Sequence, residues 1–264
     1  MKVTIIGTGN MGGAIARGLS QGTIIESCNI TCTAKSQGTL QRLATQNDKW
    51  QLSLDNSQAA TSADIVILAV KPWLMEQVIG QMAGALEPSR QIIISVAAGV
   101  SLDDLRGWLH LNKDDKYALF RAIPNTAVEV MCGTTFIAAE GATLKQSELV
   151  VEMFNQMGYA TLVEENKIDA GMALASCGIA FAMRYIRAAA EGGVELGFYP
   201  KQAQQIAALT VKGAAELLLR SGNHAEAEID KVTTPGGITI RGLNEMEHAG
   251  FTSAVIRGLK ACLK

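Results

Sequence analysis

The sequence lacks the features that several classes of protein require. Its three histidines, His110, His224 and His248, lie far apart and match no spacing of metal ligands. Its five cysteines are scattered and include no C-x-x-C pair, which is typical of free thiols in a reducing compartment. The formal net charge is −2, and no cluster of Lys and Arg interrupts the balance. These absences predict a protein without a metal site and without a nucleic-acid partner.

Long hydrophobic runs are absent as well. Charged residues or glycines interrupt every candidate before it reaches the length of a membrane span. The apolar run after Lys2 is broken by Gly7 and Gly9, too early for the hydrophobic region of a secretory signal. We therefore expect a cytoplasmic protein with no membrane partner.

Aromatic residues and prolines are scarce. Phe, Trp and Tyr make up 5% of the 264 residues and there are five prolines, whereas 48% of the chain is hydrophobic. The core must therefore be aliphatic, and the composition favours an ordered α/β or helical chain. The length fits one large domain or two modest ones.

Short apolar runs alternate with amphipathic ones over the first ~160 residues, as in βαβ units around a parallel sheet. The predicted fold class is α/β, with an N-terminal doubly wound sheet of Rossmann type. The expected strands are Lys2–Ile6, Asn29–Ala34, Asp64–Val70, Gln91–Ala97 and Tyr117–Ile123, and the expected helices include Gly13–Leu19, Trp73–Leu86 and Ser101–Leu109.

The sequence changes character after Val163. From Asn166 onward it is almost continuously helix-favouring, and apolar residues recur at three- to four-residue steps on nearly all sides of the first helix. Such a helix needs cover on more than one side, and a second copy of the same domain is the simplest cover. We predict a Rossmann domain over residues 1–163 and an all-α dimerisation domain over residues 164–264, giving a homo-oligomer. The family resemblance described below implies that the second domain is also the substrate-binding domain.

A glycine-rich turn follows the first predicted strand. The segment Gly7-Thr8-Gly9-Asn10-Met11-Gly12 fits G-x-G-x-x-G and leads into a predicted helix. In such a turn the first glycine permits the tight bend, the second lets a pyrophosphate approach, and the third allows close helix–strand packing. The predicted cofactor contacts at this turn are Gly7, Gly9, Asn10, Met11 and Gly12. An ordinary glycine turn is the alternative.

The end of the second predicted strand indicates which nicotinamide cofactor is used. An NAD enzyme places Asp or Glu there, but this chain has Thr33-Ala34-Lys35-Ser36. We therefore expect Lys35 and Ser36 to favour the 2′-phosphate of NADPH, with NADH binding more weakly. Lys35 as a solvated loop residue is the alternative.

Four segments resemble the pyrroline-5-carboxylate reductase family and span nearly the whole chain in the family's order. They are Ala69-Val70-Lys71-Pro72, Ser95–Val100 (SVAAGV), Arg121–Thr126 (RAIPNT) and Val232–Thr239 (VTTPGGIT). The resemblance implies an oxidoreductase that acts on a cyclic imine. It would reduce 1-pyrroline-5-carboxylate to L-proline with NAD(P)H, the last step of proline biosynthesis.

The resemblance also implies further cofactor contacts. Open α/β sheets bind ligands at the carboxyl ends of their strands, so we expect contacts from Ala69, Val70, Lys71, Pro72, Ala97 and Gly99. Asn56 resembles the family position that contacts a cofactor ribose, although a turn asparagine is an equal alternative. Pro124 and Asn125 would orient the nicotinamide ring, or would form only a rigid turn.

The substrate contacts implied by the resemblance lie in the Pro-Gly-Gly segment. A loop that feeds a helix N-terminus can bind a carboxylate with backbone amides. The substrate-binding residues are expected to be Thr233, Thr234, Gly236, Gly237 and Ile238, and the catalytic residue Thr239, close to the ring nitrogen. A water could deliver the proton instead. The alternative is that the threonines only cap the helix.

One segment departs from the family. Where the family commonly has S-G-S-G-P-A-Y, this chain has Ala175-Ser176-Cys177-Gly178-Ile179-Ala180-Phe181. The proline and the tyrosine hydroxyl are lost, which affects the expected wall of the substrate pocket and leaves the cofactor half unchanged.

Two other functions remain compatible with a glycine turn of this kind. A β-hydroxyacid dehydrogenase, or another imine reductase with the same turn, is the enzymatic alternative. The dehydrogenase would need a lysine on the long helix as general acid, and the first half of that helix has only Lys167, at its solvent end. A non-catalytic NADP-binding regulator is the other alternative.

Overall fold

The computed structural model describes residues 1–263 and divides into two compact units, Met1–Ser176 and Cys177–Lys264. The division into a cofactor domain and a substrate domain at residue 163 stays a prediction, since it concerns what each part binds. The compact units divide later because the segment after residue 163 packs on the first unit, where Ile168 is fully buried in the core.

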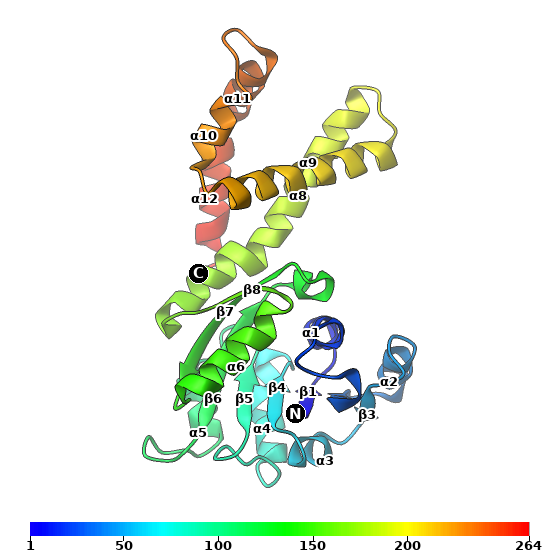
Figure 1. The fold of residues 1–264 in the computed structure, drawn as a ribbon, viewed down its shortest axis with the longest axis vertical. Helices are drawn as coiled ribbons and strands as arrows, with labels where there is room; N and C mark the ends of the chain where they lie inside the picture. The colour runs from blue at the N-terminus through cyan, green and yellow to red at the C-terminus, as the bar shows by residue number, and fades with distance from the viewer. Residues whose placement is uncertain (264) are drawn as a thin grey trace. The chain divides into compact units, whose positions relative to one another are not determined.

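One eight-stranded sheet organises the first unit (Figure 1). Its spatial order is β3-β2-β1-β4-β5-β6-β7-β8, and every neighbouring pair is parallel except β6 and β7. The order 3-2-1-4-5-6 is that of a doubly wound dinucleotide-binding sheet. The strands are β1 (Val3–Ile6), β2 (Ile30–Thr33), β3 (Gln51–Ser53), β4 (Ile65–Leu68), β5 (Ile92–Ser95), β6 (Ala118–Pro124), β7 (Gly133–Glu140) and β8 (Gly158–Leu162).

Helices cover both faces of this sheet. One face packs against α1 (Asn10–Gln21), α2 (Gln37–Ala44) and α6 (Leu144–Asn155). The other packs against α3 (Asn56–Thr61), α4 (Met75–Met82), α5 (Leu102–Trp108) and α7 (Ile168–Gly171). Because both faces are covered, the central strands are apolar at successive positions, and all four residues of β4 are buried. The predicted fold class is confirmed.

The sequence prediction located five of the eight strands, which are β1, β2, β4, β5 and β6. It missed β3, β7 and β8, and it did not foresee that β7 runs antiparallel to β6 in a sheet that is otherwise parallel. The chain reverses there through the 3-10 turn η3 (Thr126–Val130) and Met131, which has a positive φ of 59°. The helix predicted from residue 73 was also too long, because a 3-10 turn, η2 (Pro72–Leu74), precedes α4 and α4 ends at Met82.

The long helix expected from residue 166 is interrupted. It begins as a 3-10 turn, η4 (Glu165–Lys167), continues as α7, passes through the π-helical turn η5 (Met172–Cys177) and becomes α8 (Gly178–Glu195). Short π-helical turns inside helices are often found at functional sites. This one begins with Met172 and includes the first three residues of the segment that departs from the family pattern.

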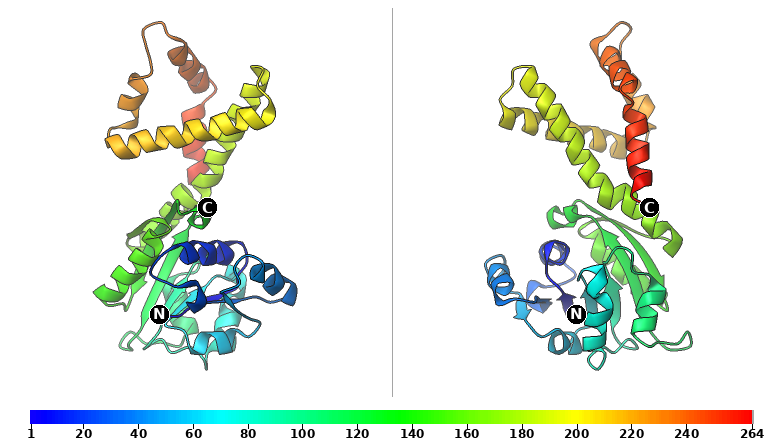
Figure 2. Two further views of the ribbon diagram at one scale, coloured as in Figure 1. Left: turned by 45° about the vertical axis from the view of Figure 1, so that its right-hand side comes forward. Right: turned by 180° about the vertical axis from the view of Figure 1, so that it is seen from behind.

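The second unit contains helices alone among its described residues. They are α8, α9 (Pro200–Ser221), α10 (Ala225–Asp230), α11 (Ile238–His248) and α12 (Phe251–Ala261), with α8 packed against α9 and α11 against α12 (Figures 1 and 2). Between α8 and α12 the rings of Tyr185 and Phe251 meet edge to face, with centroids 6.4 Å apart.

The second unit leaves much of its apolar surface exposed. Of its helices, only α9 has buried residues, Ala203 and Ala207, whereas Met183 of α8 is 59% exposed and Leu219 of α9 is 81% exposed. Within one chain this helical unit therefore buries few apolar side chains. None of the helices within residues 1–263 combines the length and apolar character that a membrane span requires.

Candidate functional site

The glycine turn connects β1 to α1 and has the geometry that the sequence predicted. Gly7 has a φ of +87°, which other residues rarely adopt, and a Cβ there would lie 2.6 Å from Cγ1 of Val70. A Cβ on Gly12 would lie 2.6 Å from the carbonyl oxygen of Gly7 and 3.2 Å from Cβ of Ala69. Around Gly9, by contrast, a Cβ would meet nothing within 4 Å. The turn is therefore tight at both ends and open in the middle.

Backbone amides with no partner point out of this turn. Gly9 is the N-cap of α1 and supplies no side-chain cap. None of the hydrogen bonds among the described residues uses the amides of Asn10, Met11 or Gly12. Unpaired amides at a helix N-terminus carry a partial positive charge and bind phosphate. The open space at Gly9 gives a phosphate room to approach these amides.

The two predicted residues after β2 have different environments. Lys35 is exposed beyond the strand end. Ser36 is the N-cap of α2, where its hydroxyl accepts a hydrogen bond from the amide of Thr39 at 3.3 Å and lies 3.0 Å from the Thr39 hydroxyl. Asn56 begins α3, directly after the cap residue Asp55, and lies half-buried. Ser36 thus has a structural role that the sequence did not indicate.

The residues that follow β4 border the glycine turn, and β5 is the next strand in the sheet. Ala69 and Val70 contact the turn, as the spacing around Gly7 and Gly12 demonstrates. Lys71 is exposed, with its Nζ 5.9 Å from the ring centroid of Trp73, and Pro72 begins η2. On β5, the neighbouring parallel strand, the predicted contacts Ala97 and Gly99 follow the strand end, Ala97 buried and Gly99 exposed with a φ of +76°.

The predicted residues after β6 are tied into the fold. Asn125 is 7% exposed and caps η3, with its Oδ1 accepting from the amide of Ala127 at 3.1 Å and from the amide of Thr134 at 3.4 Å. Its Nδ2 donates to the carbonyl of Ala175 at 3.5 Å, and the Ser176 hydroxyl donates to the carbonyl of Pro124 at 3.3 Å. Asn125 and Pro124 therefore anchor the π-helical turn by these hydrogen bonds, and their contact with the nicotinamide ring stays a prediction.

The Pro-Gly-Gly turn lies in the second unit and opens α11. Gly236 has a φ of +71°, and the amide of Gly237 donates to the carbonyl of Thr234 at 2.8 Å. The Arg241 guanidinium folds back onto the turn, donating to the carbonyls of Gly236 and Gly237 at 3.2 and 3.3 Å. The turn is thereby held in one conformation.

No threonine caps α11, so the capping interpretation was wrong. The N-cap is Gly237, which has no side chain to donate or accept, and the Thr233 hydroxyl donates instead to the carbonyl of Asp230 at 3.2 Å. Thr239 is exposed and forms no side-chain hydrogen bond among the described residues. The amides of the first turn, from Ile238 onward, are therefore available to an anion.

The role expected for Gly237 needs a different physical reason. A Cβ at this position would lie 2.5 Å from Oγ1 and 3.0 Å from the carbonyl oxygen of Thr234. The glycine is thus required by the turn itself, not by an anion beside it. Around Gly236 a Cβ would meet nothing within 4 Å.

Sequence reasoning missed a group of charged residues beside the glycine turn. A hollow of about 400 Å³ is lined by Gly9 and Asn10 of the turn together with Arg17, Arg42, Leu43, Gln46 and Glu129. These residues come from α1, α2, the loop after α2 and η3, and no local pattern relates them. The sequence analysis named Arg121 of β6 only as the start of a family segment and gave it no role; it is 5% exposed and pairs with Asp169 at 2.7 Å and with Glu165 at 3.5 Å.

The titration shifts in the described chain belong to structural groups. Burial raises the pKa of the Cys32 thiol to about 12, and a hydrogen bond from Thr8 offsets part of this shift. Burial and a hydrogen bond to Glu140 raise the pKa of Tyr117. All five cysteines are free, and residues 1–263 contain no group of three His, Cys, Asp or Glu side chains that could hold a metal ion.

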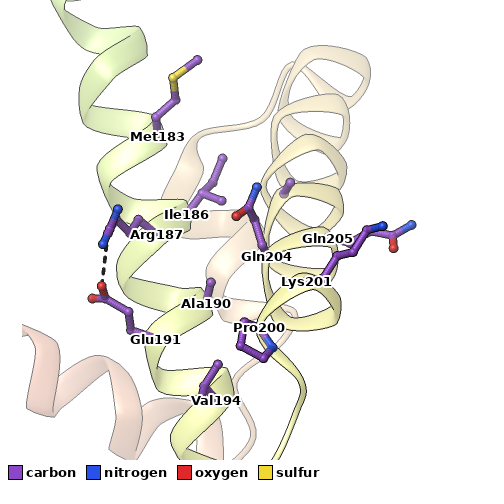
Figure 3. A pocket seen from close by; sticks show the side chains of 11 residues that line it. Met183, Ile186, Arg187, Ala190, Glu191, Val194, Pro200, Lys201, Gln204 and Gln205 are labelled. Atoms are coloured by element: carbon purple, nitrogen blue, oxygen red, sulfur yellow. Dashed lines mark hydrogen bonds and ion pairs between the residues drawn. The ribbon is translucent and has the colours of Figure 1, made fainter.

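Figure 3 shows an apolar groove between α8 and α9 in the second unit. Met183, Ile186 and Ala190 of α8 line one side, and Pro200 of α9 lines the other. Arg187 and Glu191 pair at 3.2 Å along its rim. A groove of this kind remains in contact with water unless another chain covers it.

Two family models match this chain. Residues 165–264 match the model described as pyrroline-5-carboxylate reductase dimerisation, and residues 2–99 match the one described as NADP oxidoreductase coenzyme F420-dependent. Pyrroline-5-carboxylate reductase 2 of Dictyostelium discoideum is 37% identical over 98% of this chain and 89% of its own length. The chain belongs to the pyrroline-5-carboxylate reductase family.

Two further proteins are similar to this chain. Pyrroline-5-carboxylate reductase 1 of D. discoideum is 39% identical over 97% of this chain, which spans only 48% of that protein's length. The crystal structure of pyrroline carboxylate reductase from Plasmodium falciparum, solved with NADP bound, has a TM-score of 0.88 at 24% identity and covers 100% of this chain and 95% of its own. The last comparison shows that the fold is shared.

Proposed function

We propose that this protein reduces 1-pyrroline-5-carboxylate to L-proline with NADPH, as the last step of proline biosynthesis. The observation that carries the proposal is the open glycine turn, with three unpartnered amides at the N-terminus of α1, in a chain that belongs to the pyrroline-5-carboxylate reductase family. The C-terminal Pro-Gly-Gly turn supplies the second element, the site proposed for the substrate anion.

The residues around the glycine turn fit a dinucleotide phosphate. The amides of Asn10, Met11 and Gly12 would donate to the pyrophosphate, and the missing Cβ at Gly9 leaves it room. When bound, NADPH supplies the hydride, so the protein needs no nucleophile. Ala69 and Val70 border the turn.

The choice of NADPH over NADH has support at the end of β2. No carboxylate follows that strand, so the chain has no acceptor for the ribose hydroxyls of NADH there. Lys35 is exposed and can approach a 2′-phosphate. Ser36 caps α2 by accepting a hydrogen bond at its hydroxyl oxygen, and the same hydroxyl can donate its proton to a phosphate.

The substrate would bind through its carboxylate at the Pro-Gly-Gly turn. The first amides of α11, beginning at Ile238, would donate to the carboxylate, since no side chain caps them. The exposed Thr239 hydroxyl would interact with the ring nitrogen and hold it in one orientation. Both groups act by positioning, which can supply much of the catalysis when a cofactor carries the chemistry.

The assembly is proposed to be a homodimer through the C-terminal helices. The groove between α8 and α9 and the exposed apolar side chains of both helices provide the surface, and residues 165–264 match a dimerisation family. Cytoplasmic location stays a prediction, which the five free cysteines support.

The direct test is an assay of the purified chain with NADPH and 1-pyrroline-5-carboxylate. We expect NADPH consumption in step with the appearance of L-proline, quantified by chromatography. Thr239→Ala should retain NADPH binding and lose turnover, which separates the substrate half from the cofactor half. Oxidation of a β-hydroxyacid with NADP, without proline formation, would favour the dehydrogenase alternative. Tight NADPH binding without turnover of either substrate would favour the regulator.

A further inference from the structure

The hollow beside the glycine turn is built by three separate segments of the first unit. Gly9 and Asn10 contribute the turn and the start of α1, Arg42 comes from α2, and Glu129 from η3. Figure 1 shows α2 lying beyond α1 at the same end of the unit. The hollow therefore lies next to the amides proposed for the cofactor pyrophosphate, on the side of α2.

Two of the three charged side chains around this hollow pair with each other, and the third does not. Arg17 donates to Glu129 and to Gln46, both at 2.8 Å, so its guanidinium and the Glu129 carboxylate largely neutralise one another. Arg42 is exposed and takes part in no ion pair or side-chain hydrogen bond found within residues 1–263. One unengaged guanidinium thus lines a hollow that adjoins a phosphate-binding turn.

The geometry points to Arg42 as a specificity-determining residue that binds the 2′-phosphate of NADPH. This inference rests on the proposed function, in which the dinucleotide binds at the glycine turn. The adenosine ribose of a dinucleotide lies beyond the end of the second strand, and α2 follows that strand directly. Arg42 lies in the last turn of α2, and the hollow extends from there to Gly9 of the glycine turn. The pyrophosphate has its own donors in the α1 amides, so Arg42, the unengaged cation that lines this hollow, is left for the 2′-phosphate.

Arginine suits this role better than the residues found at the strand end. A guanidinium can form two parallel hydrogen bonds to one phosphate, whereas a lysine acts as a point charge. Ser36 can donate a single hydrogen bond and carries no charge. Lys35 then adds positive charge after β2, and Arg42 supplies the geometric recognition.

The test compares cofactor affinities in matched variants of the full chain. Arg42→Ala removes the guanidinium, and Arg42→Lys keeps the charge without the fork. Lys49→Ala is the control, because it removes an exposed positive charge a few residues away that does not line the hollow. The Kd values of NADPH and NADH are measured by fluorescence titration, with adenosine 2′,5′-bisphosphate and AMP as competing probes. Thermal melting of each variant checks that the fold is intact.

We expect Arg42→Ala to raise the Kd of NADPH and of adenosine 2′,5′-bisphosphate by on the order of tenfold or more. The Kd of NADH and of AMP should change less than about twofold, and Arg42→Lys should fall between. Equal weakening of both cofactors would overturn the assignment and move Arg42 to the pyrophosphate. If Arg42→Ala bound NADPH as tightly as the wild type, and the wild type made proline, this inference alone would be overturned. A wild type that binds no NADPH would overturn the proposed function as well.

Discussion

Gly9 and Gly12 lie on the same turn, but an added methyl group meets different surroundings at each. At Gly9 there is no atom within 4 Å, and the backbone φ of −81° lies outside the left-handed region. At Gly12 the methyl group would lie 2.6 Å from a backbone oxygen of Gly7 and 3.2 Å from Ile5. Gly9→Ala should therefore leave the fold intact and obstruct the cofactor, whereas Gly12→Ala should strain the fold.

The expected sizes follow from these contacts. If the methyl group at Gly9 displaces one hydrogen bond to a charged phosphate, the loss is about 1.5–3 kcal/mol, or roughly 10- to 150-fold in the Kd of NADPH. Overpacking at Gly12 should lower the free energy of unfolding by about 1–3 kcal/mol. The better helix propensity of alanine offsets at most about 1 kcal/mol of that cost.

The pair is tested by denaturant unfolding without cofactor and by titration with NADPH. Gly9→Ala should unfold like the wild type and bind NADPH weakly, while Gly12→Ala should unfold earlier. If Gly9→Ala bound NADPH with wild-type affinity, the assignment of the pyrophosphate to this turn would be refuted. If Gly12→Ala were as stable as the wild type, the contact with Gly7 could not be as tight as the structure has it.

Four further predictions concern other parts of the chain. Lys35→Glu should erode the preference for NADPH, and tighter binding of NADH than of NADPH by the wild type in a titration would contradict the cofactor assignment. Met183→Glu should dissociate the homodimer, because an unpaired charge buried in the interface costs several kcal/mol; a wild type that is monomeric at micromolar concentration by light scattering would disprove the interface. Gly237→Val should raise KM sharply, because its side chain clashes with the Thr234 backbone. Thr239→Ala should lower kcat roughly 10- to 100-fold, as expected for the loss of one hydrogen bond of about 1–3 kcal/mol. Steady-state kinetics separates the two effects. Burial raises the pKa of Cys32 to about 12, so the native thiol stays protonated in mildly alkaline buffer. The contribution of the protonated thiol to the free energy of unfolding is lost as the pH rises toward 12. Mass spectrometry should find Cys32 alkylated only after unfolding.

Local patterns in the sequence determined the cofactor half to a large extent. The G-x-G-x-x-G segment requires a particular turn, because the φ of Gly7 and the packing of Gly12 tolerate no side chain. The apolar runs of β1, β4 and β5 identified buried parallel strands, since both faces of such strands are covered. Patterns of this kind depend on neighbours within a few residues, so the sequence alone reveals them.

Other features depend on residues distant in the chain. The antiparallel β7 and the edge strands β3 and β8 are only partly buried, so they carry no strong apolar signal. The uncapped start of α11 and the commitment of Ser36 to α2 appear only once hydrogen bonds have formed.

The hollow beside the glycine turn is the clearest case of a feature that only the tertiary structure decided. Arg42 and Glu129 are 87 residues apart in the printed sequence, and neither lies in a motif. Packing of α1, α2 and η3 on the sheet brings them to one place and leaves Arg42 unpaired while Arg17 neutralises Glu129. Sequence spacing predicts contacts along one element, but the partners of a charged side chain are decided by which elements the core brings together.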